Sequence, residues 1–307
     1  MFFILFAAAI ASSLREDFSS FEAKYGKNYV PAERAFRAKI FDYNMKWIEK
    51  TNAEGHSYTV GVTPFADMTN TEFASMYASS SLLKPVMIKP ANPVLDIAFE
   101  TVDWREKGAV SPVKNPGPSA ECWALSAMDA MESGNFIANG KMVLVSEQQL
   151  LDCVSHTSES RGGMVTSAFD YVKQKGICSS SDYPYSGKHE TCKDSSCTPA
   201  FHITGYEKVT PDDGKALKAA VYKTPVVVHI DASSRIFQMY KSGVIDSPDC
   251  GTQLNHAVVA VGYTDEYWIL KNSWGSMWGE KGYLRIAYSE TGSGICGINL
   301  YELYPTF

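Results

Sequence analysis

The sequence predicts an α+β protein in which a largely helical half precedes a half rich in β-strands. Three helices are expected in the first half: one from Cys122 to about Asn139, one behind a capping box at residues 146–149, and one over residues 164–175. From residue 225 the pattern changes to β-rich runs at 226–230, 257–261, 267–270 and 283–286, which Gly, Asp and Asn separate. This order of elements indicates two packed lobes.

A polar region that is free of cysteine and helical in pattern precedes both lobes, over residues 14 to about 80. Six of its residues lie three or four positions apart and therefore share one face of a long helix: Glu33, Arg37, Phe41, Asn44, Ile48 and Asn52. A turn followed by a short strand is expected at residues 61–67. A linker rich in Ser and Pro covers residues 79–93 and marks a boundary near residue 97.

The first residues have the character of a signal peptide. Residues 1–13 are apolar, the chain turns polar at residues 15–17, and Ala9-Ile10-Ala11 offers a cleavage site, so we expect residues 1–11 to be removed. The apolar run is shorter than the roughly 20 residues of a transmembrane helix. A frayed core helix is the alternative interpretation.

Composition narrows the classes of function. A net charge of −6 and a pI of about 5.6 argue against nucleic-acid binding, and no run of like charge suggests a membrane-surface patch. Seven cysteines leave one thiol over if the other six pair in an oxidising compartment. No cysteines have C-x-x-C spacing and no His pair has zinc-ligand spacing, so we expect neither a metal nor a cofactor.

Cys122 is the cysteine with a chemical reason to remain a thiol. It heads an expected helix, and the partial positive charge of a helix N-terminus lowers a thiol pKa. His256, at the start of a β-run, could take the proton, and Asn272 could orient the imidazole through its other nitrogen. One buried Cys or one His is usually structural, but the combination is far more specific for nucleophilic catalysis.

These motifs resemble those of papain-like cysteine proteases of the cathepsin L type over nearly the whole chain. The helical stripe matches the ERFNIN propeptide pattern, and Gly61, Phe65 and Asp67 match the GxNxFxD segment with Thr63 in place of Asn. The resemblance implies a papain-like fold, with a helical left lobe and a β-barrel-like right lobe. It also implies an inhibitory propeptide over residues 12–97 and a peptidase domain over residues 98–307.

The resemblance also implies roles for individual residues. Cys122 would be the nucleophile, His256 the general base and acid, and Asn272 the residue that orients His256. A shallow pocket would receive the substrate residue two before the scissile bond, and His229 would favour an acidic group there. The residues that would line this pocket are Met164, Val165, His229, Leu254 and Tyr301. The implied substrate-binding residues are Gly162, Gly163, Met164, Val165, His229, Leu254, Trp274 and Tyr301. The implied disulfides are Cys153–Cys192 and Cys250–Cys296, with Cys178–Cys197 as a third.

The implied activity is hydrolysis of peptide bonds in peptide or protein substrates, by an enzyme made as a zymogen. Its own propeptide would inhibit it, and cystatin-like proteins are further candidate inhibitors. We expect a monomer in the secretory pathway that reaches a lysosome or vacuole or the cell exterior.

The segment before Cys122 departs from the family pattern at three positions. Pro116 stands where the family has the glutamine that donates a hydrogen bond to the oxyanion. Ser119 replaces a cysteine whose partner position holds Ser160, and Glu121 replaces a small residue beside the nucleophile. The departures raise the alternative of an impaired papain-fold protein that binds peptides or inhibitors. A purely structural secreted domain would not explain the propeptide pattern.

Overall fold

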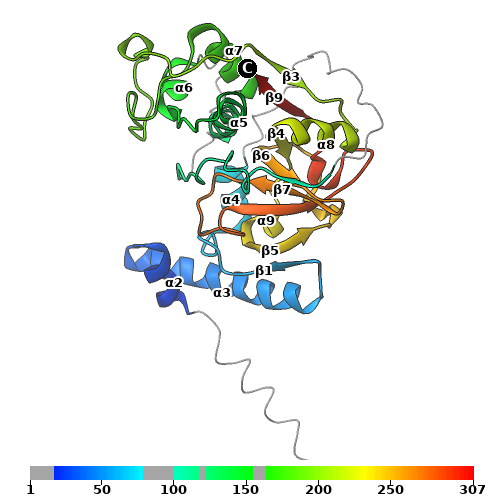
Figure 1. Cartoon of the computed structure of the whole chain (residues 1–307). Coiled ribbons are helices and arrows are strands. Elements are labelled where there is room, and N and C mark those ends of the chain that lie inside the picture. The colour runs from blue at the N-terminus through cyan, green and yellow to red at the C-terminus, as the bar shows by residue number, and fades with distance from the viewer. Residues whose placement is uncertain (1–16, 79–99, 118–121, 155–163) are drawn as a thin grey trace, which may run out of the picture.

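The computed structural model describes residues 17–78, 100–117, 122–154 and 164–307. Helices α5, α6 and α7 form one lobe, the strands form a second lobe, and helix α3 lies on the far side of the strands (Figure 1). The two-lobe α+β prediction is confirmed. The predicted signal peptide and the linker up to the boundary near residue 97 lie outside the described residues. None of the described helices is both long and apolar enough to cross a bilayer.

The helical lobe is built around α5 (Cys122–Asn139), which is buried at every position from Cys122 to Asn135. It packs with α6 (Glu147–Cys153) and α7 (Val165–Lys175), as the sequence predicts. Only half of the predicted capping box forms. The Ser146 hydroxyl accepts the Gln149 N–H at 2.9 Å. The Gln149 side chain does not return to Ser146 but binds the hydroxyl of Tyr171 and the N–H of Cys178.

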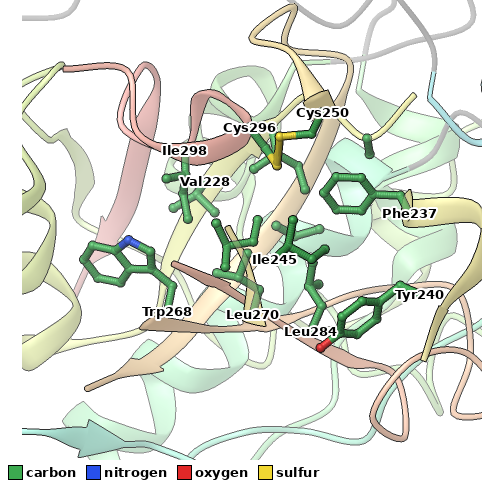
Figure 2. Packing of buried hydrophobic residues seen from close by; sticks show 14 of the residues in the cluster. Val228, Phe237, Tyr240, Ile245, Cys250, Trp268, Leu270, Leu284, Cys296 and Ile298 are labelled. Carbon is green, nitrogen blue, oxygen red and sulfur yellow. A yellow bond between two sulfur atoms is a disulfide. The ribbon is translucent and has the colours of Figure 1, made fainter. Parts of the chain in front are cut away.

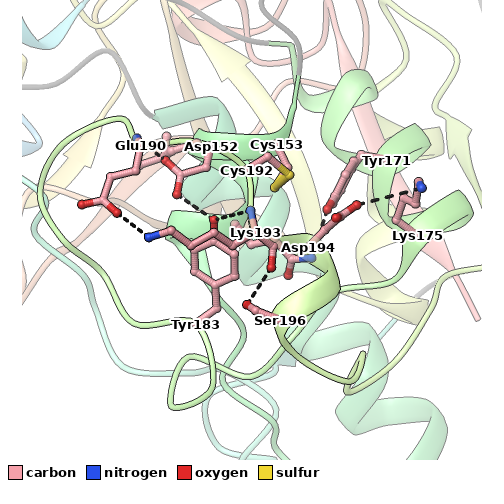
Figure 3. The surroundings of a disulfide bond; sticks show 12 residues. Asp152, Cys153, Tyr171, Lys175, Tyr183, Glu190, Cys192, Lys193, Asp194 and Ser196 are labelled. Carbon is pink, nitrogen blue, oxygen red and sulfur yellow. Dashed lines mark hydrogen bonds and ion pairs between the residues drawn. A yellow bond between two sulfur atoms is a disulfide. The ribbon is translucent and has the colours of Figure 1, made fainter.

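Disulfides secure the loops beside these helices. All three implied pairs form, Cys153–Cys192, Cys178–Cys197 and Cys250–Cys296, and Cys122 remains a free thiol. Figure 3 shows the first bridge, where the Tyr183 hydroxyl donates to Asp152 at 2.7 Å and accepts the Lys193 N–H at 3.2 Å. A bridge of this kind adds about 2–4 kcal/mol, mainly by constraining the unfolded chain.

The second lobe is a mostly antiparallel sheet. Among the described residues the strands follow the order β1-β5-β8-β7-β6-β4-β9-β3, β2 pairs with β6, and β5 and β8 are parallel. The predicted runs correspond to β4, β6, β7 and β8, whereas β3, β5, β9 and helix α8 (Gly214–Lys223) were not predicted. The strand bounds are Tyr58–Val60, Val102–Asp103, Gly205–Lys208, Val226–Ile230, Tyr240–Ile245, His256–Tyr263, Tyr267–Lys271, Tyr283–Ala287 and Glu302–Thr306 for β1 to β9.

The sheet is buried on both faces. Figure 2 shows one face, where Val228, Leu270 and Leu284 belong to the same buried cluster as the Cys250–Cys296 bridge. Alternate residues of the same strands, such as Val227 and Val259, belong to the cluster around α5. Successive strand side chains point to opposite faces, so β6 is buried at all eight positions. The strand that begins at His256 is therefore held rigidly between the two lobes.

The N-terminal region comprises α2 (Phe18–Tyr25), α3 (Pro31–Ala53), β1 and α4 (Asn70–Tyr77). The predicted stripe lies on α3 and fixes the following chain. Asn44 Nδ2 donates to the carbonyls of Ala66 and Met68 at 2.8 and 2.9 Å, and Asn52 bonds both backbone groups of Val60.

The prediction of a short strand within residues 61–67 was wrong. The strand in this region is β1, which precedes these residues and pairs with β5. Residues 61–67 instead bind a side chain and a carbonyl of the β lobe. Thr63 Oγ1 donates to the Gln238 carbonyl at 2.7 Å, and Gln238 Nε2 donates to the Phe65 carbonyl at 3.0 Å.

The contact between β1 and β5 requires a glycine. Gly243 has a φ of +93°, and a Cβ atom there would lie 2.4 Å from the Ser57 carbonyl oxygen. The missing side chain allows β1 to approach β5 at the Tyr58↔Gly243 pair. The N-terminal region thereby becomes the edge of the sheet.

Candidate active site

A buried hydrogen bond joins His256 to Asn272. The Asn272 Oδ1 atom lies 2.9 Å from His256 Nε2 and also accepts the Ser273 N–H at 2.8 Å. The second bond identifies this atom as the amide oxygen, which can only accept. His256 therefore carries a proton on Nε2 and a lone pair on Nδ1. Among the described residues Nδ1 has no partner, although it is buried, so the imidazole presents an unused base.

Cys122 lies at the N-terminus of α5 and is 7% exposed. The backbone of Ala257 makes a polar contact with its sulfur, which brings the residue after His256 against the thiol. Burial raises the pKa of the Cys122 thiol to about 11, and the backbone contacts from Ala257, Trp123 and Cys122 itself act in the opposite direction. The helix N-terminus was expected to lower this pKa, but in the closed site burial outweighs it.

Burial also lowers the pKa of His256, from its ordinary 6.5 to about 4. The hydrogen bond with Asn272 opposes this shift but does not cancel it. Between about pH 4 and pH 11, the closed site therefore holds a neutral Cys122 thiol and a neutral His256 imidazole. Formation of a thiolate requires either transfer of the proton to His256 or entry of water.

Aromatic side chains cover the site. The Trp274 ring stacks on the His256 imidazole with centroids 4.7 Å apart. Three residues of the N-terminal region, Phe65, Phe73 and Tyr77, meet Trp274 edge-on at 5.3 to 6.1 Å. The region thus shields the histidine from solvent.

Several of the other candidate residues belong to the same buried cluster as Cys122 or adjoin it. Val165 and Tyr301 belong to the buried cluster that contains Cys122, and Leu254 packs against that cluster. Met164 immediately precedes α7 as its N-cap. His229 joins the group through Tyr301, because its Nδ1 lies 2.8 Å from the Tyr301 carbonyl and the two rings are 4.9 Å apart. The remaining two candidates, Gly162 and Gly163, lie outside the described residues.

The segment before Cys122 is described as far as Gly117. Asn115 Oδ1 accepts the Gly117 N–H at 3.2 Å, and the intervening Pro116 has neither a side-chain donor nor a backbone N–H. The other two departures, Ser119 with its partner position Ser160 and Glu121, lie outside the described residues.

The sequence reasoning missed a buried ionic cluster behind the site. Asp129 and Glu132 of α5 meet Lys114 and Lys271 across the interface of the lobes. Two acidic residues in an otherwise uncharged, buried helix were the available signal, because such groups are rarely buried unless paired. No set of three His, Cys, Asp or Glu residues within the described ranges could hold a metal ion.

Comparison with known families matches both parts of the chain. Residues 98–306 match the model described as "Papain family cysteine protease", and residues 18–73 match "Cathepsin propeptide inhibitor domain (I29)". The chain belongs to the papain family of cysteine proteases. It is a papain-family zymogen with a propeptide, whose model matches the N-terminal region.

Similar proteins include several plant proteases. The Senescence-specific cysteine protease of Oryza sativa subsp. japonica is 40% identical over 299 residues, which cover 92% of this chain and 88% of the relative. Ananain of Ananas comosus is 38% identical over 307 residues, with 95% and 88% covered. Among solved structures, a recombinant stem bromelain precursor has a TM-score of 0.87 at 39% identity, with 94% and 97% covered. The likeness includes the propeptide.

Acid should destabilise the zymogen through its buried histidines. Burial holds the pKa of His229, like that of His256, at about 4, against 6.5 in the unfolded chain. Between pH 4 and pH 6.5 these histidines bind protons in the unfolded chain but not in the folded protein. The free energy of unfolding therefore has its full value above pH 6.5 and decreases as the pH falls to 4. Each histidine contributes a loss of up to about 3 kcal/mol. We expect thermal unfolding of a Cys122→Ser zymogen, which cannot process itself, to shift steeply downward over this range.

The control is the same zymogen with His229→Leu. It should lose a clearly smaller part of its stability between pH 6.5 and pH 4, because one of the two titrating groups is gone. Parallel pH curves for the two zymogens would contradict the assignment of acid sensitivity to His229.

Proposed function

We propose that this zymogen matures into a peptidase that hydrolyses peptide bonds through a thioester on Cys122, with His256 as general base and acid and Asn272 as its orienting partner. The observation that carries the proposal is the fixed tautomer of His256. The Nε2–H donates to Asn272 Oδ1, so the free lone pair is on Nδ1, as a base beside a thiol requires.

The chemistry follows from this arrangement. Nδ1 of His256 takes the proton of the Cys122 thiol, and the sulfur attacks the carbonyl carbon of the scissile bond. The imidazolium then gives the proton to the leaving amine, which leaves a thioester on Cys122. Water hydrolyses the thioester with His256 again as the base, and the thiol is restored.

Oxyanion stabilisation is the weak part of this site. The Cys122 backbone N–H at the head of α5 remains as a donor, whereas Pro116 supplies none. Loss of one oxyanion donor typically costs about 10²–10³ in rate. We therefore propose a slow peptidase rather than an inactive one.

Latency follows from the propeptide. Its residues Phe65, Phe73 and Tyr77 surround Trp274, and this apolar cover favours the neutral forms of Cys122 and His256. We propose that cleavage near residue 97 removes the cover and that water then stabilises the charged pair. The mature enzyme is proposed to be a monomer, delivered through the secretory pathway to a lysosome or vacuole or outside the cell, where cystatin-like proteins could inhibit it.

The alternative function is that of a pseudoprotease, which binds peptides or inhibitors without turning them over. Pro116 is the observation in its favour. Retention of the His256–Asn272 bond favours the peptidase, because a protein that only binds peptides does not need a fixed imidazole tautomer.

An active-site titration separates the two functions. Relatives of this family have been solved with the epoxide inhibitor E-64, for example a cysteine protease of Carica candamarcensis. We expect acid-matured enzyme to take up one equivalent of an epoxide at Cys122 and to cleave a peptide substrate, measured by intact mass and fluorescence. The Cys122→Ser variant should show neither. Labelling without turnover would favour the pseudoprotease, and folded enzyme without labelling would refute Cys122 as the nucleophile.

Restoring the oxyanion donor should accelerate the enzyme. With Pro116→Gln we expect kcat to rise at least tenfold, towards the 10²–10³ that one donor typically supplies. The matched control is Pro112→Gln, an exposed proline of the same segment, for which kcat should not change. Equal kcat for wild type and Pro116→Gln in steady-state assays would show that the oxyanion argument is wrong.

The tautomer of His229 should determine which side chain the enzyme prefers at the substrate position two residues before the scissile bond. The Tyr301 carbonyl can only accept, so His229 carries its proton on Nδ1, and burial keeps the imidazole neutral with a pKa of about 4. Its Nε2 is then a hydrogen-bond acceptor. We therefore propose that the pocket favours a hydrogen-bond donor rather than the acidic group that the sequence suggested.

Threonine and valine substrates test this proposal because the two side chains have nearly the same shape. We expect kcat/KM for Thr at this position to exceed that for Val about fivefold, the value of one net hydrogen bond. His229→Val should abolish the preference. A profile in which glutamate or aspartate ranks first would contradict it.

A further inference from the structure

Three segments that build the candidate active site meet at one buried carboxylate. Asp129 lies on α5, seven residues and about two turns after Cys122, and therefore on the same side of the helix. Lys271 is the last residue of β7 and immediately precedes Asn272. Lys114 belongs to the segment that leads through Pro116 to Cys122.

The contacts at Asp129 are short and shielded from water. Its Oδ1 atom lies 2.6 Å from Lys114 Nζ and 2.9 Å from Lys271 Nζ. Ser111 completes the group, because Lys271 Nζ donates to its hydroxyl at 3.0 Å. The side chains of Lys271 and Asp129 are only 1% and 6% exposed. An ion pair removed from water in this way is far less screened than one at the surface.

The two lysines differ in their dependence on Asp129. Lys114 also pairs with Glu132 at 2.9 Å, so it keeps a carboxylate if Asp129 is lost. Among the described residues, the carboxylate that forms an ion pair with Lys271 is that of Asp129. The Asp129–Lys271 pair is therefore the ionic contact that joins the helix of Cys122 to the strand of Asn272.

The backbone around Asn272 is tied to the same group. Lys271 pairs with Val259 of β6 and with Tyr283 of β8, so its main chain has little freedom. The Gly275 N–H, three residues after Asn272, donates to the Lys114 carbonyl at 3.1 Å. A displacement of Lys271 or Lys114 would therefore be transmitted to the turn that carries Asn272.

We propose that Asp129 is a positioning residue, which through Lys271 sets the placement of Asn272, and so of the His256 imidazole, relative to Cys122. The inference rests on the proposed function. Loss of the charge of Asp129 leaves Lys271 buried without a carboxylate, and the strand end must move to solvate it. Displacements of about 1 Å in such a site can cost about 10²-fold in rate.

The test uses alkylation of the mature enzyme by iodoacetamide, a small neutral reagent that does not need the peptide-binding cleft. The second-order rate constant at Cys122 is measured from pH 4 to 9, well below the unfolding temperature of each variant. We expect Asp129→Asn to lower the rate at pH 5 at least tenfold and to move the acid limb to higher pH. The kcat for a peptide should fall in parallel, with KM changed little.

Glu132→Gln is the matched control. Glu132 is a buried carboxylate of the same helix, three residues further on. It shares Lys114, but among the described residues the carboxylate within ion-pair distance of Lys271 is that of Asp129. It should lower the unfolding temperature while its alkylation profile overlays that of wild type. If Asp129→Asn does not fold, the double variant Asp129→Asn/Lys271→Met removes the unpaired buried charge and should fold. Because the ionic contact between α5 and the end of β7 is also absent in it, its alkylation profile should shift in the same direction.

The outcomes separate this inference from the proposed function. If wild-type Cys122 is alkylated no faster than an ordinary thiol and does not cleave peptides, the proposed function fails. If wild type is reactive but folded Asp129→Asn, or the double variant, has an unchanged profile, the positioning role is wrong and the proposed function stands. A shift of equal size in Glu132→Gln would also overturn it, because the effect would then not depend on Lys271.

Discussion

The hydrogen bond from His256 Nε2 to Asn272 Oδ1 is the contact on which the proposed chemistry of this molecule depends. It decides which nitrogen of the imidazole is the base, and it is kept from water by Trp274 stacked on the ring. The bond requires β6 and β7 to be neighbours with a fixed register, which the Val259↔Lys271 pair provides. It then requires α5 to present its first residue to the same point, and Cys122 lies in one buried cluster with Ala257, the residue after His256. The two buried clusters on opposite faces of the sheet hold all of these elements in place.

The burial that protects this bond also opposes the charged form of the site. A thiolate and an imidazolium both lose hydration in a closed cavity, so the pKa of Cys122 rises while that of His256 falls. We propose that the propeptide adds to this burial through Phe65, Phe73 and Tyr77, whose rings meet Trp274. It is fixed to the β lobe by Gln238 and by the pairing of β1 with β5. In the proposed function, latency of this zymogen is therefore an electrostatic state of the site.

The sequence was informative where a pattern is local. The helix from Cys122 ends at Asn139 as predicted because Gly140 adopts a positive φ, and the stripe on α3 follows from spacing alone. Strand β5 was not predicted because its sequence includes Lys241 and Gly243, which interrupt the apolar pattern of a strand. The glycine is explained only by the pairing of β1 with β5 at this edge of the sheet. The tautomer of His229 and the pairing of Asp129 with Lys271 depend on contacts between residues more than 70 positions apart, so no local pattern reports them.

The effect of Pro116 can be weighed against what remains of the site. One oxyanion donor is worth about 3–4 kcal/mol of transition-state stabilisation, whereas enzymes lower their barriers by about 8–23 kcal/mol. Three other proposed contributors are present in this chain: an imidazole with a fixed tautomer, a thiol at a helix N-terminus, and a backbone N–H beside it. Groups of a catalytic set act together, so loss of the nucleophile or base removes nearly all of the acceleration, whereas loss of one donor removes only its share. Cys122 is therefore expected to be slow rather than idle.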